Sequence, residues 1–208
     1  FGGLPLDFPL LGSGVGSQPF KTEKDYQDWL KRMEKFPEWM MAAEANFREG
    51  MKNGIVLPKK LVLKMIPQMN AAELTSSDFD INIFYGPVKN FPKNFSNAQR
   101  EKLTASFKEV VAKKVIPAYT KMGTFLETDY LPKARTTDGL NALPKGNEIY
   151  AYYTKSWTTS AKTPEEINKI GLEQVAMLRG EMEKVKQDLG FTGTLEQFIT
   201  YVKSDPKA

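Results

Sequence analysis

The chain has 208 residues, with 29 Lys and Arg residues against 25 Asp and Glu residues and a formal net charge of +4. This length suits one domain or two small ones and is sufficient to bury a core. Hydrophobic residues make up 41% of the chain and charged residues 26%, a composition typical of globular proteins that excludes disordered, collagen and coiled-coil chains.

The sequence contains no Cys and no His. The lack of Cys excludes disulfides, a thiolate nucleophile and cysteine metal sites. The lack of His excludes Ser-His-Asp catalysis and the usual zinc sites. A site for Ca²⁺ or Mg²⁺ built from carboxylates remains compatible with the composition. We therefore expect this chain by itself to be catalytically silent.

The first 21 residues are rich in Gly, Pro and Ser, and they are predicted to form an irregular arm. The apolar start lacks the basic residues of a signal peptide and is broken by Pro5 and Pro9. Because the chain begins with Phe1, we expect a processed product or a piece of a longer chain. No apolar run approaches the roughly 20 residues that a membrane-spanning helix needs.

A helical pattern begins at Thr22, where Asp25 completes a variant of the capping box. Pro37 is expected to restart the chain in the first turn of a second helix. Gly54 is well placed to end that second helix. Pro58 is predicted to open a third helix.

Residues 70–95 are looser, and residues 80–85 are expected to be extended, without a clear pairing strand. Ser96 and Gln99 form a capping box that opens a long helical stretch. Pro117 should kink or break this stretch, because proline removes a hydrogen bond and clashes with the preceding turn.

The last third of the chain contains the strongest helix start, at residues 163–166, with a cap, an N1 proline and two acids. Apolar residues then recur at steps of three and four: Ile167, Gly171, Val175, Leu178, Met182, Val185 and Leu189. Gly190 is the predicted stop, and Thr194 caps a last helix. The sequence thus predicts a mostly α fold, an irregular helical bundle with long kinked helices and little or no sheet. Residues 22–208 are predicted to form a single α-helical domain.

One segment is unusually aromatic. Residues 146–159 crowd together Tyr150, Tyr152, Tyr153 and Trp157, with Lys155 and Thr158 among them. Such a stripe can pack on neighbouring helices, or it can line a binding site, because a buried phenol needs a hydrogen-bond partner. The sequence leaves both interpretations open.

Arg135 is a further candidate, because its guanidinium could hold a carboxylate through two parallel hydrogen bonds. The alternative is a cation placed favourably near a helix C-terminus. The remaining basic residues form few adjacent pairs and mostly lie near acids, which does not favour nucleic-acid binding.

Several segments together carry a family resemblance: Leu143–Gly146, Tyr150–Tyr153, Thr163–Ile167 and Gly190–Thr194. With the arrangement around Thr22 and Pro37, they resemble a bacterial family catalogued as domain of unknown function 885. The resemblance covers essentially the whole chain.

The resemblance implies several properties that the composition does not show. Members of the family resemble helical zinc metallopeptidases and are commonly exported or lipid-anchored in the cell envelope. Their H-E-x-x-H motif, in which two His bind zinc and the Glu activates water, lies C-terminal to the segment that ends at Ala208. Zinc is therefore expected in the full-length parent and no cofactor in this chain. The family usually has His where this sequence has Asn168, which leaves open whether activity is altered.

The sequence thus predicts the N-terminal helical part of a metallopeptidase-like protein, acting as scaffold and as one wall of a peptide-binding cleft. The residues expected to line that wall are Arg135, Tyr150, Tyr153, Lys155 and Thr158. The expected partner is the missing C-terminal part of the same chain, docked on exposed apolar surface, with a dimer through that surface as a second outcome. The alternative is a self-sufficient, non-enzymatic helical binding module.

Overall fold

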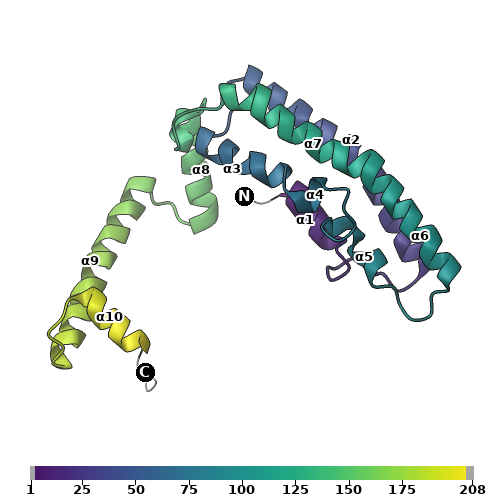
Figure 1. The fold of residues 1–208 in the computed structure, drawn as a ribbon. Coiled ribbons are helices and arrows are strands. Elements are labelled where there is room, and N and C mark those ends of the chain that lie inside the picture. Colours follow the sequence, from purple (N-terminus) through teal and green to yellow (C-terminus); the bar gives the residue numbers. More distant parts are fainter. Residues whose placement is uncertain (1–2, 205–208) are drawn as a thin grey trace. The chain divides into compact units, whose positions relative to one another are not determined.

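The computed structural model describes residues 3–204 and confirms the mostly α fold (Figure 1). Within these residues the regular structure is helical, and the one extended pairing is an isolated parallel bridge between Pro58 and Arg135. The chain forms two compact units, Phe1–Pro144 and Lys145–Ala208. The predicted single domain over residues 22–208 therefore comprises most of the first unit and all of the second.

The first unit is built on two long, parallel helical stretches with shorter helices beside them (Figure 1). Its α-helices are α1 (Leu4–Leu11), α2 (Glu23–Lys52), α3 (Lys59–Met69), α4 (Ala72–Thr75), α5 (Gly86–Lys89), α6 (Asn97–Val110) and α7 (Ile116–Phe125). Two π-helical turns, η2 (Val111–Val115) and η3 (Leu126–Tyr130), continue α6 and α7. Three 3-10 turns complete it: η1 (Ile83–Tyr85), η4 (Leu131–Lys133) and η5 (Leu140–Ala142).

Helix α2 begins as predicted, with a capping box between Thr22 and Asp25. It then runs through Pro37 without interruption, so the predicted restart at that residue is wrong. The helix buries Trp29, Phe36 and other apolar side chains along one face. Because most helix stability in proteins comes from packing of an apolar face, this burial outweighs the hydrogen bond lost at the proline.

The second long stretch also passes through its proline. The N–H of Ile116 donates to the carbonyl of Val111, five residues earlier, and Pro117 follows immediately. The N–H of Leu131 donates to the carbonyl of Leu126 in the same way, just before Pro132. A wider π turn shifts the hydrogen-bond register where proline supplies no donor, so the helix absorbs Pro117 without breaking.

The N-terminal arm contains a helix, α1, where the sequence analysis expected irregular chain. Pro5 lies in the first turn, where its missing N–H costs nothing. Phe8 stacks between Trp29 and Phe36, with ring centroids 4.6 and 4.7 Å away. The hydroxyl of Tyr119 donates to the carbonyl of Pro5 at 2.5 Å. These tertiary contacts order a segment whose local composition favours a loop.

Residues 80–85 also differ from the expected extended piece, because they end in the 3-10 turn η1. The side chain of Asn82 is buried and accepts a hydrogen bond from the N–H of Phe84 at 3.0 Å. Its amide donates to the carbonyl of Ser76 at 2.8 Å. The Asn82 side chain therefore forms hydrogen bonds with backbone groups of this segment that a neighbouring strand would otherwise form.

The second unit contains α8 (Gly146–Thr158), α9 (Pro164–Asp188) and α10 (Leu195–Ser204). The predicted capping box of Thr163 and Glu166 begins α9, and Gly190, with φ of 69°, follows its end. Among the described residues of this unit, the buried ones are Gly146, Leu195 and Phe198. The aromatic core of the protein therefore lies in the first unit.

A substitution at Gly12 tests the packing of the arm on the core. A Cβ at Gly12 would overlap the fully buried ring of Trp29, so Gly12→Ala should destabilise the first unit by about 1–3 kcal/mol. A Cβ at Gly180, inside α9, meets no atom within 4 Å, and Gly180→Ala should stabilise its helix by up to about 1 kcal/mol. Urea denaturation followed by circular dichroism measures both. Equal effects of the two substitutions would contradict this packing.

Alkaline pH provides a second test. Burial raises the pKa of Tyr26 to about 12, and it also raises the pKa values of Tyr85, Tyr119 and Tyr130. Since the unfolded tyrosines ionise near pH 10, the stability that these groups contribute is complete below that pH and is lost as pH rises through the folded pKa values. The free energy of unfolding should therefore fall between pH 10 and 12, and Tyr26→Phe should flatten that fall.

Candidate functional site

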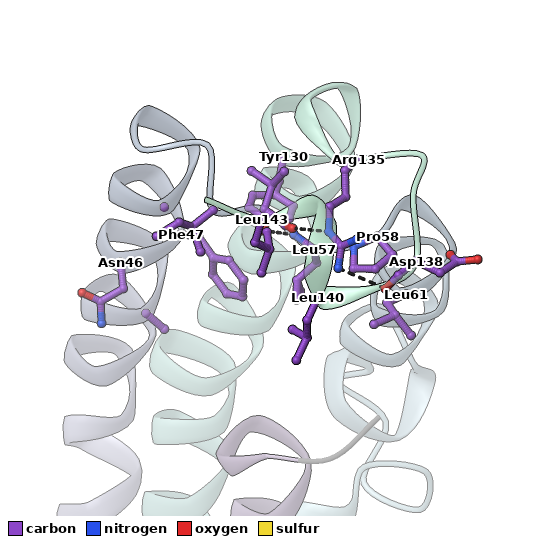
Figure 2. Close-up of a pocket in the computed structure, with 14 residues that line it drawn as sticks. Asn46, Phe47, Leu57, Pro58, Leu61, Tyr130, Arg135, Asp138, Leu140 and Leu143 are labelled. Atoms are coloured by element: carbon purple, nitrogen blue, oxygen red, sulfur yellow. Dashed lines mark hydrogen bonds between the residues drawn. The ribbon is translucent and has the colours of Figure 1, made fainter. Parts of the chain in front are cut away.

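The first unit contains an apolar groove with a volume of about 590 Å³ (Figure 2). It lies between the C-terminal half of α2, the start of α3 and the turn-rich connector after η4. Its lining is mostly apolar: Ala43, Phe47, Ile55, Val56, Leu57, Pro58, Leu61, Leu140 and Leu143, with Gly50 at the backbone. The polar side chains on it are Asn46, Tyr130, Arg135 and Asp138.

Backbone pairing fixes one wall of this groove. The N–H of Lys59 donates to the carbonyl of Arg135 at 2.7 Å, and the N–H of Arg135 donates to the carbonyl of Leu57 at 3.1 Å. The N–H of Leu57 donates in turn to the Tyr130 hydroxyl oxygen at 2.9 Å. The segment between α2 and α3 is thereby joined to the connector (Figure 2).

The guanidinium of Arg135 is bound to the protein's own backbone. Its Nε donates to the carbonyl of Val56 at 3.0 Å, and its Nη1 donates to the carbonyls of Thr137 and Gly139 at 2.7 and 2.8 Å. Its Nη2 donates to the carbonyl of Asp138 at 3.2 Å. Four backbone acceptors thus occupy the fork that the sequence analysis assigned to a substrate carboxylate. The substrate-binding role of Arg135 stays a prediction.

The groove offers recognition of apolar groups more than acid–base chemistry. Burial raises the pKa of Tyr130, while the hydrogen bond from Leu57 and the charge of Arg135 act in the opposite direction. The carboxylate of Asp138 is exposed and pairs with Lys60, with 3.0 Å between Nζ and Oδ2. Within residues 3–204, no group of three or more Asp or Glu side chains could hold a metal ion. The surface suits an apolar side chain with polar groups at its rim.

The other four predicted site residues lie on α8, in the second unit. Tyr150 and Tyr153 are 51% and 48% exposed, so neither phenol is part of a core within the described residues. Lys155 and Thr158 are exposed as well, and the Thr158 hydroxyl donates to the carbonyl of Thr154 at 2.8 Å. The structure therefore places these four on one helix. A site shared by them and Arg135 stays a prediction.

Helix α8 has a further property that the sequence analysis missed. The residues that flank it, Lys145 and Thr159, have left-handed backbone conformations, with φ of 56° and 51°. Such conformations are costly for residues other than Gly, and most of all for a β-branched Thr. Strained backbone of this kind clusters at functional sites.

The sequence analysis also missed the groove itself. Leu140 and Leu143 lie in a connector whose Gly139, Pro144 and Gly146 are typical of turns. The two leucines in this connector were the available signal, because turns exposed to water are mostly built from polar residues, Gly and Pro. Asn46 gave no signal, because a polar residue on an amphipathic helix is ordinary.

The comparisons with known proteins assign the family. A family model described as "Bacterial protein of unknown function (DUF885)" matches residues 6–208, so the chain belongs to this family, as the resemblance predicted. No curated protein matches the chain.

One solved structure shows the same fold, that of a protein from Colwellia psychrerythraea described as a "putative lipoprotein". The two sequences are 23% identical, and the TM-score is 0.86. The match covers 99% of this chain and 35% of the other, so the chain spans about a third of that protein's length. In the part of the chain that the structure describes, no helix is both long and apolar enough to cross a membrane.

The hydrogen bonds of Arg135 predict the effect of replacing it. Lysine cannot reach four acceptors from one planar group, so Arg135→Lys should destabilise the first unit by about 2 kcal/mol and expose residues 136–143 to proteases. Arg32→Lys is the control, because exposed Arg32 donates one hydrogen bond, to the side chain of Gln18, and its replacement should change stability by less than about 0.5 kcal/mol. An unchanged urea midpoint for Arg135→Lys would show that this residue does not hold the connector.

Proposed function

We propose that this chain is the N-terminal helical part of a longer cell-envelope protein of the metallopeptidase type, in which it provides scaffold and one wall of a peptide-binding cleft. Membership of the family over residues 6–208 supports this proposal, as does the match to about a third of a longer protein. The name of that longer protein supports the envelope location. The first unit, with its aromatic core, is the scaffold.

The exposed aromatic face of α8 is the observation that carries the binding role. Tyr150, Tyr153 and Trp157 follow one another at steps of three and four, which places them on the same side of the helix. Trp157 is 84% exposed. Exposed aromatic rings supply large, rigid contact area, and phenol hydroxyls add hydrogen bonds to peptide groups. Lys155 is two residues from both Tyr153 and Trp157, about 160° around the helix, so its cation lies on the other side of α8.

The zinc ion expected for the parent protein does not fit the residues of this chain. The sequence has neither His nor Cys, and the described residues hold no cluster of carboxylates suited to a metal. Zinc in a metallopeptidase activates the attacking water. In the proposal, its ligands belong to polypeptide outside these 208 residues, and this chain contributes binding surface only.

The gene sequence beyond the codon for Ala208 is the first test. An in-frame H-E-x-x-H motif on an amphipathic helix supports the proposal, and the complete product should then bind zinc and hydrolyse peptides. A stop codon soon after Ala208 contradicts the proposal. That result would favour a self-sufficient, non-enzymatic binding module, for which the apolar groove of the first unit is the candidate surface.

A pair of neighbouring tyrosines tests the wall itself. In the complete product, Tyr153→Ala should lower kcat/KM for peptide hydrolysis about tenfold, which corresponds to about 1.4 kcal/mol of lost binding. Tyr152→Ala is the matched control, because Tyr152 lies about 100° away around the helix and is 68% exposed. The control should stay within twofold of the unmodified protein. An equal loss of kcat/KM for both substitutions would contradict the proposal that peptide binds to one particular side of α8.

A further inference from the structure

Helix α9 carries a long apolar stripe that the described structure leaves uncovered. The stripe comprises Gly171, Val175, Leu178, Met182, Val185 and Leu189. Its side chains are 40–68% exposed, and no residue of the 25-residue helix is buried. We call this stripe the α9 seam.

The spacing of the seam defines how it can be covered. Its members follow one another at steps of four, three, four, three and four residues. At 100° per residue these steps keep every member within a narrow band along the helix. This is the a/d pattern with which one helix packs against another, knobs into holes. The seam therefore fits a single long helix better than a loop or a flat surface.

The two flanks of the seam differ. One flank carries Arg179 and Lys186, and α10 packs against this flank. Arg179 pairs with Glu196 of α10, with 3.2 Å between Nη2 and Oε1, and the Lys186 side chain is only 14% exposed. Figure 1 shows α10 lying across the C-terminal half of α9. The basic flank is thus occupied.

The opposite flank is open and acidic. It carries Gln174, Glu181 and Asp188, which are exposed. A second copy of this chain fits the seam poorly in either direction. In an antiparallel pair, the acidic flank of one copy would face Glu181 and Asp188 of the other. In a parallel pair, it would face a basic flank already covered by α10, and Gly171 would face Gly171 and leave a void. A helix with Lys or Arg beside its apolar stripe complements the open flank.

We propose that the α9 seam docks one amphipathic helix with a basic flank, supplied by the part of the same polypeptide that lies outside these 208 residues. The proposal rests on the proposed function, in which this chain is part of a longer protein. The solved structure with the same fold contains about twice as much further chain, since this chain covers 35% of it. A covered seam would remove from water the largest apolar stripe of the second unit.

The test uses two adjacent residues of nearly equal exposure in the complete gene product. Leu178, in the seam, is 51% exposed, and Met177, about 100° around the helix, is 47% exposed. Leu178→Lys should lower the thermal midpoint by at least about 3 °C, because it puts a charge into the docked seam. Met177→Lys should leave the midpoint within about 1 °C. Equal shifts would overturn the proposal.

Charge reversal tests the basic partner in the same protein. Glu181→Lys, beside the seam, should lower the thermal midpoint, and this loss should shrink at high salt. Glu173→Lys makes the same charge change on the far side of α9 and should have no such effect. If both variants changed the thermal midpoint equally, the inference that the docked helix carries a basic flank would be wrong.

Two further measurements separate the outcomes. If light scattering shows that the 208-residue chain forms a dimer that Leu178→Lys dissociates, a second copy occupies the seam and the proposal is overturned. Zinc content and peptide hydrolysis of the complete product test the proposed function independently. If Leu178→Lys alone lowers the thermal midpoint but the complete product neither binds zinc nor hydrolyses peptides, the docked seam is supported and the proposed function is contradicted. If the complete product binds zinc and hydrolyses peptides but Leu178→Lys and Met177→Lys shift the midpoint equally, only the docked seam is contradicted.

Discussion

Burial of the apolar face of α2 is the constraint on which the first unit depends. Trp29 and Phe36 on this face hold Phe8 between them, which orders the N-terminal helix α1. Their burial also keeps α2 continuous through Pro37. The long stretch of α6 and α7 must remain helical to cover the same face, and its two π turns reconcile that requirement with Pro117 and Pro132. Packing of this one face thus overrides three local helix-breaking signals.

The two units use their apolar residues in opposite ways. The first unit places its aromatic side chains in a core, where Tyr26, Tyr85, Tyr119 and Trp29 are almost fully buried. The second unit exposes its large apolar residues on α8 and α9. A helix with a sustained apolar stripe gains most of its stability when that stripe is covered. The difference agrees with a division into a scaffold and a surface that other parts of a longer protein complete.

Local signals predicted the elements that depend on local chemistry. The caps at Thr22, Ser96 and Thr163 begin helices as expected, because a hydroxyl that accepts a backbone N–H acts within four residues. Predictions at Pro37 and at residues 4–11 failed because distant side chains decide those segments. The family was recognisable from short motifs, because each motif consists of neighbouring residues that can be read directly in one sequence.

The candidate site was less predictable for the same physical reason. The exposed aromatic residues of α8 could be found by their crowding, but the groove around Arg135 joins segments far apart in the chain. The hydrogen bond from Arg135 to the carbonyl of Val56 joins residues 79 positions apart. A periodic pattern in the sequence cannot predict a contact over such a separation. The acceptors of the Arg135 guanidinium are main-chain carbonyls, which every residue type offers equally.

The pairing of Arg135 with the segment before α3 also has a consequence for biosynthesis. Its bonds reach from Val56 to Gly139, so the first unit cannot be completed until this connector has left the ribosome. Domains generally fold as units during synthesis, and the N-terminal one folds first. The nascent chain would then hold a finished core while α9 is still awaiting its cover. During that interval the apolar seam of α9 is exposed to water, and we expect a chaperone to bind there. Because the first unit is already folded, its aromatic core is not exposed at the same time.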